Sequence, residues 1–390
     1  MKSDKTTPNV PTLRFKQYHC PWSTYHLSDI AEVVGGGTPD TTVPSLWNGD
    51  IQWFTPTEVG HQKYVSKSAR TITQLGLQKS SAKKLPAGSI LLSSRATIGE
   101  CSIAQRECTT NQGFQNLIPK NDTNNEFLYY LAQTKKHHFI KYASGSTFLE
   151  ISNSEIRKTK CTVPGTEEQT QIAAFLSALD DRISVQNKII EDLKILKKEL
   201  CNKVFSKGTA VRLGELIEEV TVRNKSNACD NVLSVSNKMG FIKQSEQFED
   251  RTIASENKSN YKVVTKGCFA YNPARINVGS IALLSSHSVG IISPMYVCFK
   301  AKNVLDSTYL SFYYQSNFFA RELQKKLEGS VRQCLTYENM RETIIPYVDI
   351  ERQREIATTL NRFTMLIATE EKCLKALQKQ KTYFLNAMFI

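Results

Sequence analysis

Polar side chains that could contact a nucleic acid lie in two similar segments of the chain. SSRATIG at residues 93–99 and NPARINVG at residues 272–279 each place an arginine among small and polar residues, between runs that read as strands. A guanidinium can donate two parallel hydrogen bonds to a phosphate or a guanine, and Asn, Gln and Thr side chains also contact bases. The spacing indicates a polar binding loop in each half of the chain.

Catalytic motifs are missing from the sequence. Gly35–Gly37 lacks the spacing of a nucleotide-binding loop, and NPAR at residues 272–275 lacks the second proline and the aromatic residue of an amino-methyltransferase motif. Asp192-Leu193-Lys194 resembles a nuclease pair but lies on a predicted long helix. The ten cysteines form no C-x-x-C pair, so we expect reduced, mostly buried thiols and no metal site. The sequence predicts a chain that binds and does not catalyse.

A segment predicted to form a long helix occurs twice, 184 residues apart. Residues 167–205 and 351–389 align without a gap, begin with E-x-Q-x-x-I-A, and contain neither glycine nor proline. Their apolar residues follow alternating spacings of four and three, which is a heptad pattern. Thr166 and Gln169 form a candidate capping box at the start of the first copy. Each helix would be about 58 Å long.

Each predicted helix needs a partner for its apolar stripe, and the economical partner is the other copy. The pair could be parallel or antiparallel, and a pseudo-two-fold axis would make it antiparallel; alternatively, each helix packs only on its own domain. Lys197 and Lys381 interrupt the stripe at matching positions, which weakens it but fixes its register. The expected seam residues are Ile172, Leu176, Leu179, Ile183, Leu193, Leu200, Ile356, Leu360, Ile367, Leu374, Leu377 and Phe384.

The globular halves also resemble each other, although they diverge more than the helices. Phe127–Tyr130 matches Tyr309–Phe312, and both lie in aromatic-rich stretches that read as helices. We expect an α+β protein with two similar mixed α/β domains, an antiparallel pair of long coiled-coil helices between them, and a pseudo-two-fold internal repeat. The expected parts are an N-terminal segment at 1–22, a first domain at 23–165, a central helix at 166–207, a second domain at 208–349 and a distal helix at 350–390.

The chain is strongly basic, and the positive charge lies mostly in the globular halves. Lys and Arg number 50 against 37 Asp and Glu, a formal charge of +13. The first predicted long helix has seven acidic and six basic residues, so it contributes none of this excess. Such a charge favours a polyanionic partner, nucleic acid first and an acidic membrane surface second. No apolar run is long enough to span a membrane, and the N-terminus does not read as a secretory signal, so we expect a cytoplasmic protein.

In the order and duplication of its motifs, the chain resembles the specificity (S) subunits of type I restriction-modification systems. The resemblance covers nearly the whole chain. The motifs that carry it are VPTLRF at 10–15, the segment Trp22–Val33, GGGTP at 35–39, LPAGSILLSSRATIGECSIA at 85–104, TNQGFQNLIP at 110–119, the two E-x-Q-x-x-I-A helices, NPARINVGSIA at 272–282 and GIISPMYVCF at 290–299.

The resemblance implies a division of labour. Each globular half would be a target recognition domain for one half of a split, asymmetric site on double-stranded DNA. The paired helices would act as a spacer and as a docking surface for two methyltransferase (M) subunits that carry S-adenosylmethionine. Motor-nuclease (R) subunits that use ATP and Mg would join them. This chain would bind no cofactor, no metal, no membrane and no small-molecule substrate, and it would not be an enzyme.

Exposed polar residues next to the glycine-bounded strands are the best candidates for contacting DNA. Phosphate contacts would supply salt-sensitive affinity, and base-edge contacts would supply sequence choice. The alternative role of each arginine is an ion pair within its own domain. The candidates are Arg95, Thr97, Asn111, Gln112 and Thr147 in the first domain and Arg275, Asn277, Arg332 and Gln333 in the second.

Three other functions remain open at the level of sequence. The chain could be a stand-alone sequence-specific or architectural DNA-binding protein with a coiled-coil spacer. It could be a methyltransferase with a degraded motif, which would then transfer methyl groups by itself. It could also be a coiled-coil adaptor whose basic charge meets another protein or a membrane, in which case its binding to DNA would be absent or insensitive to salt.

Overall fold

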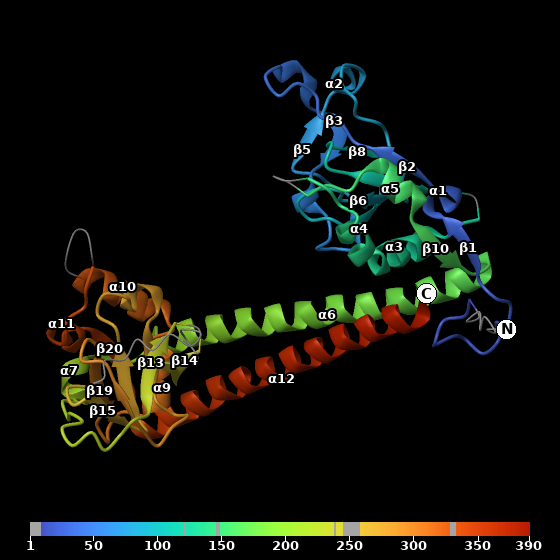
Figure 1. The fold of residues 1–390 in the computed structure, drawn as a ribbon. Helices are drawn as coiled ribbons and strands as arrows, with labels where there is room; N and C mark the ends of the chain where they lie inside the picture. Colours follow the sequence, from blue (N-terminus) through green and yellow to red (C-terminus); the bar gives the residue numbers. More distant parts are fainter. Residues whose placement is uncertain (1–8, 121, 146–148, 238, 245–257, 328–332) are drawn as a thin grey trace. The chain divides into compact units, whose positions relative to one another are not determined.

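The chain folds into two compact units, seen in the computed structural model of Figure 1. Unit 1 comprises residues 1–187 and 373–390, and unit 2 comprises residues 188–372. The structure describes residues 9–120, 122–145, 149–237, 239–244, 258–327 and 333–390. Two 39-residue helices, α6 (Thr166–Val204) and α12 (Ile350–Met388), pass from one unit into the other, so each unit contains a section of both helices.

Unit 1 is built on two small sheets and a strand pair. The first sheet has the order β2-β9-β6-β7-β4, and the second has the order β5-β3-β8. The strands are β1 (Ser23–His26), β2 (Ala31–Gly35), β3 (Trp47–Phe54), β4 (Tyr64–Val65), β5 (Arg70–Ile72), β6 (Ile90–Leu92), β7 (Cys101–Ala104), β8 (Cys108–Thr110), β9 (Gln115–Pro119) and β10 (Lys160–Val163). β1 and β10 pair antiparallel beside them.

Unit 2 repeats this plan with two four-stranded sheets. The order β12-β19-β16-β17 reproduces β2-β9-β6-β7, and the second sheet has the order β14-β13-β18-β15. The strands are β11 (Thr209–Arg212), β12 (Ile217–Glu219), β13 (Val232–Ser236), β14 (Gly240–Lys243), β15 (Lys262–Thr265), β16 (Cys268–Tyr271), β17 (Ile281–Leu283), β18 (Val289–Ile292), β19 (Val297–Ala301) and β20 (Ile344–Tyr347). β11 pairs with β20 as β1 pairs with β10.

Most of the short helices also occur in matching positions. In unit 1 these are α1 (Leu27–Ile30), α2 (Gln74–Gln78), α3 (Asn125–Thr134), α4 (Lys136–Lys141) and α5 (Asn153–Lys158). In unit 2 they are α7 (Leu213–Leu216), α9 (Ser307–Tyr313), α10 (Asn317–Lys326) and α11 (Tyr337–Arg341). Short 3-10 turns lie at Pro44–Leu46, Pro56–Glu58 and Ile276–Val278. The expected strands and aromatic-rich helices of both halves are confirmed, as is the α+β fold class.

One glutamine ties each long helix to the globular part of its unit. The Gln169 side chain accepts a hydrogen bond of 3.0 Å from the backbone amide of Asn124, which caps α3, and donates one of 2.9 Å to the Pro164 carbonyl. Gln353, at the matching position of α12, does the same with Asp306 and Val348. The predicted capping box is wrong, because Gln169 points to the α3 loop and the Thr166 hydroxyl donates to the Asp122 carbonyl.

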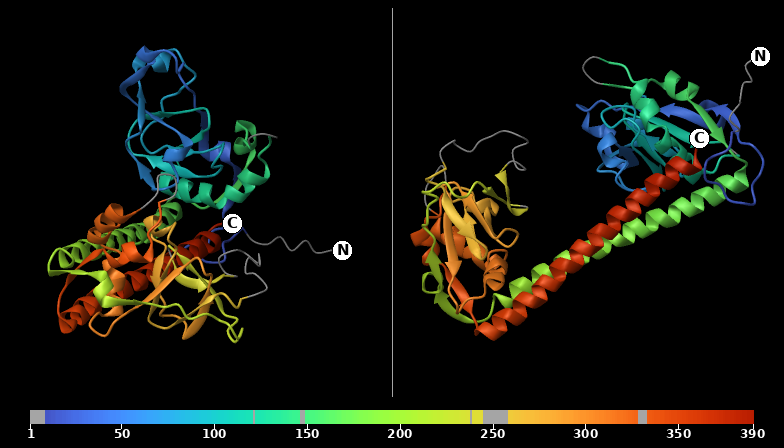
Figure 2. Two further views of the ribbon diagram at one scale, coloured as in Figure 1. Left: turned by 90° about the vertical axis from the view of Figure 1, so that its left-hand side faces the viewer. Right: turned by 60° about the horizontal axis from the view of Figure 1, so that its bottom comes forward.

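The two long helices run antiparallel in each unit (Figure 2). In unit 1, the rings of Phe175 on α6 and Phe384 on α12 pack edge to face at 4.9 Å, and Asp180 pairs with Lys381 about one turn further along. In unit 2, Lys194 of α6 lies 2.6 Å from Glu371 of α12. The residue numbers rise along one helix as they fall along the other, which confirms the expected antiparallel pair.

The core of unit 1 joins segments that are far apart in the sequence. Trp22 packs edge to face against Phe127 and Phe389, and those two rings stack at 5.1 Å. The N-terminal segment is held by Arg14, whose guanidinium makes two 2.7 Å contacts with the nearly buried carboxylate of Glu168. A charge-assisted ion pair therefore fixes the N-terminal segment to the start of α6, and apolar burial fixes Phe389 against Trp22 and Phe127.

Candidate nucleic-acid interface

In unit 1, four loops converge at the ends of β2, β3, β6 and β8. The Gly37 amide donates to the Thr110 carbonyl at 2.8 Å, the Asn111 amide to the Phe54 carbonyl at 3.0 Å, and the Ser94 amide to the Gly113 carbonyl at 2.8 Å. Gly36 leaves no room for a side chain, since a Cβ there would lie 1.9 Å from the Asn111 carbonyl oxygen. The glycine run is thus required by close backbone approach.

Arg95 and Thr97 lie in one of these loops, between β6 and β7. The loop turns through Ala96, whose φ of 62° is in the left-handed region. The Arg95 guanidinium donates to the Glu150 carboxylate, through Nε at 3.1 Å and through a terminal nitrogen at 2.5 Å, while its side chain remains 41% exposed. Arg95 therefore forms an ion pair within its own domain, and its remaining N–H groups are left for other partners. Thr97 is exposed.

Asn111 and Gln112 follow β8 and lie beside the Arg95 loop. The half-buried Asn111 carbonyl oxygen accepts a 2.9 Å hydrogen bond from the Gly113 amide, so this side chain shapes its own turn. Gln112 is exposed and accepts a hydrogen bond from the Thr38 hydroxyl. The structure therefore brings four of the five candidates of the first domain together. The fifth, Thr147, lies outside the described residues.

Arg70 is a basic residue of unit 1 that the sequence analysis missed. It lies on β5, and its guanidinium stacks 3.6 Å from the centroid of Trp47, which is itself edge to face with Trp53. An exposed guanidinium held on an aromatic face keeps donors that could reach a phosphate or a base. In the sequence, polar and apolar residues alternate in the segment of Arg70 and in the segment of the two tryptophans. This alternation does not indicate that the two segments pair.

In unit 2, Arg275 and Asn277 lie in the loop between β16 and β17. The buried Asn272 organises this loop, because its side chain accepts from the Ala274 amide and its backbone amide donates to the Ser280 carbonyl. Arg275 and Asn277 are exposed, and the turn closes at Gly279 with φ of 86°. Unlike Arg95, Arg275 forms no ion pair with any residue of the described chain.

The residue that corresponds to Glu150 explains the difference between the two arginines. Ile151 donates its amide to Ser94, and Leu335 makes the matching bond to Pro273, so the two strips of chain are equivalent. Glu150 precedes Ile151, whereas Cys334 precedes Leu335. Gln333 is exposed next to this strip, and Arg332 lies outside the described residues. Arg275 thus presents a full positive charge where Arg95 is partly neutralised.

The predicted seam residues are among the less exposed residues of the two long helices. They are buried or half-buried, in contrast to neighbours such as Val185 and Leu196, which are 58% and 55% exposed. In unit 1 these are Ile172, Leu176, Leu179, Ile183, Leu374, Leu377 and Phe384. In unit 2 they are Leu193, Leu200, Ile356, Leu360 and Ile367.

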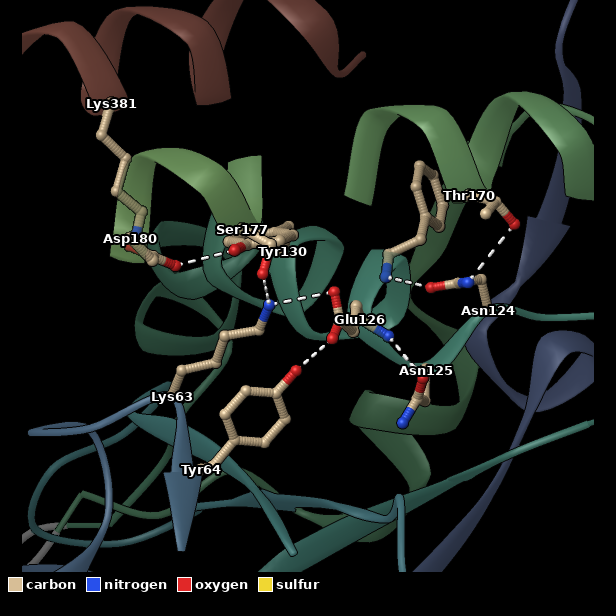
Figure 3. A network of polar contacts seen from close by, with 11 residues as sticks. Lys63, Tyr64, Asn124, Asn125, Glu126, Tyr130, Thr170, Ser177, Asp180 and Lys381 are labelled. Atoms are coloured by element: carbon tan, nitrogen blue, oxygen red, sulfur yellow. Dashed lines mark hydrogen bonds and ion pairs between the residues drawn. The ribbon is translucent and has the colours of Figure 1, made fainter. Parts of the chain in front are cut away.

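A polar network fixes the globular part of unit 1 to the helix pair (Figure 3). Lys63, from the loop before β4, donates to the Ser177 hydroxyl of α6 at 2.8 Å and pairs with Glu126 of α3 at 3.0 Å. The Tyr130 hydroxyl donates to the Asp180 carboxylate at 2.7 Å, and that carboxylate pairs with Lys381 of α12. The globular part of unit 1, which carries the loops of Arg95 and Asn111, is therefore bonded to both long helices.

Within the described ranges, no three His, Cys, Asp or Glu side chains gather as metal ligands, and no helix has the length and apolarity needed to cross a bilayer. All ten cysteines are free, and six are buried. Burial raises the pKa of Cys101 and Cys108 to about 12 and that of Cys201 to about 11, so these thiols stay protonated and unreactive near neutral pH.

A known family model matches most of the chain. The model of the type I restriction modification DNA specificity domain matches residues 20–194 and again residues 209–379. A specificity subunit of the type I restriction enzyme MjaIX from Methanocaldococcus jannaschii is 40% identical over 188 residues, 47% of this chain and 44% of the relative. The putative MjaX specificity subunit of the same organism is 24% identical over 94% of this chain and 92% of its own length.

Solved structures share the fold over nearly the whole chain. The S subunit of a type I restriction-modification system from M. genitalium has a TM-score of 0.59 at 15% identity, over 98% of this chain and 99% of its own. A chain from a study of complex assembly in the type I R-M system has a TM-score of 0.58 at 17% identity, over 95% of this chain and 98% of its own. The alignments cover less than half the length of MjaIX and of the Escherichia coli EcoR124I/EcoR124II specificity subunit.

Proposed function

Because this chain belongs to the family of the type I restriction modification DNA specificity domain, we propose that it is the DNA sequence-recognition subunit of a type I restriction-modification complex. Its two units act as target recognition domains that bind the two parts of a bipartite, asymmetric DNA site. Its long helices dock two methyltransferase subunits, and motor-nuclease subunits join that assembly. The chain works in the cytoplasm and does not catalyse; S-adenosylmethionine belongs to the M subunits, and ATP and Mg to the R subunits.

The observation that carries this proposal is the duplicated polar loop. Arg95 and Thr97 in unit 1, and Arg275 and Asn277 in unit 2, follow equivalent strands of equivalently ordered sheets, yet their surroundings differ. A shared scaffold with different loop chemistry is what a protein needs in order to read two unlike half-sites. The basic excess of the chain supplies attraction to phosphates, and the loops supply contacts to base edges.

The proposal is tested by the methylation pattern that this chain directs. The full chain is expressed with a type I methyltransferase subunit from the same genome in a host without adenine methylation, and single-molecule sequencing reads the modified adenines. We expect one bipartite motif that disappears without this chain. Methylation by the lone chain, or an unchanged pattern when it is deleted, would contradict the proposal. Tight specific DNA binding without any response to a methyltransferase would indicate a stand-alone DNA-binding protein.

The Arg275→Ala variant tests whether the loop between β16 and β17 contacts DNA. Loss of a bidentate contact with guanine costs about 1–3 kcal/mol of binding free energy and relaxes sequence choice at one base of one half-site. The control is Arg321→Ala, because Arg321 is also exposed in unit 2 but lies on α10. An Arg275→Ala complex that keeps both affinity and motif would remove this residue from the interface.

A further inference from the structure

The internal repeat places two lysines, Lys381 and Lys197, at equivalent points on the long helices. In unit 1, Lys381 of α12 pairs with Asp180 of α6 at 2.6 Å, and its ammonium lies 5.6 Å from the centroid of the Tyr130 ring. The Tyr130 hydroxyl donates to the other oxygen of the same carboxylate at 2.7 Å. Lys381 thus has an internal counterion, held in place by a phenol (Figure 3).

Unit 2 keeps the lysine but lacks both of these partners. Lys197 of α6 lies over the ring of Phe312 at 5.2 Å, as Lys381 lies over Tyr130. Phe312 carries no hydroxyl, and the position of Asp180 in the repeat is occupied by Thr364, whose hydroxyl donates to the Leu360 carbonyl of its own helix. Within the described chain no carboxylate lies within ion-pair distance of the half-buried Lys197.

A cavity occupies the place of the missing groups. It has a volume of about 320 Å³ and lies between α6, α12 and the end of α9. Lys197, Thr364 and Ile367 line it together with Lys198, Cys201 and Gln315. The Cys201 thiol is buried and donates to the Phe312 carbonyl at 3.4 Å, so it adds no negative charge. Lys194, at the rim, is already paired with Glu371.

Burial therefore destabilises the charged form of Lys197 and lowers its pKa. A partly desolvated ammonium without a counterion gains free energy when an anion reaches it. The wall of the cavity combines donors from Lys197, Lys198 and Gln315 with the apolar surface of Ile367, so it suits an anion on an apolar stem rather than a fully hydrated one.

We propose that this cavity in unit 2 is a binding site for a carboxylate on a short aliphatic stem, whose oxygens take the place that Asp180 fills in unit 1. A free carboxylic acid and a glutamate side chain of another protein both present this chemistry. The carboxylate accepts hydrogen bonds from the Lys197 ammonium, and the stem packs beside Ile367. This site is separate from the loops of Arg275 and Asn277, and the inference does not rest on the proposed function.

Binding is measured with the full chain and three probes: sodium butanoate, inorganic phosphate, and a capped peptide with one glutamate between leucines. Sodium chloride at equal ionic strength is the reference. The readouts are the thermal midpoint and the NMR signals of ¹³Cε-labelled lysines. We expect a saturable response to butanoate or to the peptide, with a rise in the pKa of Lys197. Losing a charge-assisted hydrogen bond weakens binding about tenfold or more, so Lys197→Met should raise the Kd by that factor.

Matched variants test the role of the missing counterion. Thr364→Asp restores the carboxylate within the chain, so this variant should have a higher thermal midpoint and no response to either carboxylate. Thr364→Asn has nearly the same shape without the charge, and it should respond like the parent chain. Lys203→Met removes an exposed lysine from the same helix outside the cavity lining and should also respond like the parent.

The responses to the three probes distinguish the possible sources of the carboxylate. A response to butanoate shows that a free acid suffices, and a response to the peptide alone identifies a protein as the source of the carboxylate. Saturable binding of phosphate without either carboxylate overturns the assignment of the ligand class. The proposal is also overturned if no probe binds, or if Lys197→Met and Thr364→Asp respond like the parent chain.

Discussion

Asp180 on α6 and Lys381 on α12 form an ion pair of 2.6 Å, with side chains only 17% and 19% exposed. Within unit 1 this contact joins residues 201 positions apart in the sequence and lies against Tyr130 of α3. It therefore links both long helices to the globular part of the unit. Because both charges are largely removed from water, each depends on the other for its stability.

Removing one partner of this pair should destabilise unit 1 strongly. Asp180→Asn or Lys381→Met leaves a mostly buried charge without its counterion, so we expect a loss of about 2–4 kcal/mol in the free energy of unfolding. Urea unfolding followed by tryptophan fluorescence measures this, since all three tryptophans lie in unit 1. Lys84→Gln breaks the exposed pair with Glu107 in the same unit and should cost less than about 1 kcal/mol. Equal losses in the two variants would refute the structural role of the Asp180 pair.

A charged substitution on the helix seam should lower the free energy of unfolding more when the replaced residue is more deeply buried. Leu377 is 5% exposed in unit 1, so Leu377→Asp removes a buried side chain and introduces an unpaired charge; we expect a loss of at least about 3 kcal/mol. Val185→Asp, at a 58% exposed position of α6, should change stability by less than about 0.5 kcal/mol. Leu193→Asp, at a half-buried position, should fall between them and should weaken docking of the methyltransferase. A normally assembling Leu193→Asp, Leu377→Asp double variant would show that the seam is assigned incorrectly.

Glu150 should restrain DNA binding by Arg95. Its carboxylate accepts from two guanidinium nitrogens and also places a negative charge in a loop proposed to approach phosphates. Glu150→Gln should therefore bind DNA severalfold more tightly at low salt, with a steeper decrease as salt is added. Fluorescence anisotropy across a salt series measures both quantities. Glu107→Gln is the control, since Glu107 is an exposed acid of unit 1 paired with Lys84; an identical gain there would reflect net charge alone.

Stability should decrease in alkaline solution because of the buried thiols. Burial raises the pKa of Cys101, Cys108 and Cys298 from 9.0 to about 12, whereas in the unfolded chain these thiols ionise near 9. Above pH 9 the unfolded state therefore binds fewer protons than the folded state, and the free energy of unfolding falls as pH rises toward 12. Urea unfolding at pH 8 and pH 10 measures the decrease. Cys298→Ala should make it shallower, and an unchanged pH dependence in that variant would contradict the contribution of this thiol.

The long helices and the repeat follow from local patterns. Heptad spacing in residues 167–205 and 351–389 depends only on the geometry of a single helix, so it predicts α6, α12 and their buried faces without knowledge of the fold. The same holds for the strands around Arg95 and Arg275, where apolar runs end at glycines. The expected capping box failed because Gln169 is used in a contact with Asn124, 45 residues away, which no local rule contains.

Which charges are neutralised was decided only by the tertiary structure. Arg95 and Arg275 lie in similar segments, and so do Lys381 and Lys197, yet in each pair one cation has a carboxylate partner and the other has none among the described residues. Whether a hydrogen bond or ion pair forms depends on differences of a few tenths of an ångström in the distance between atoms on separate elements. Periodicity and composition carry no information at that scale, so the difference between the two units in paired and unpaired cations appears only once Glu150 and Asp180 are seen in place.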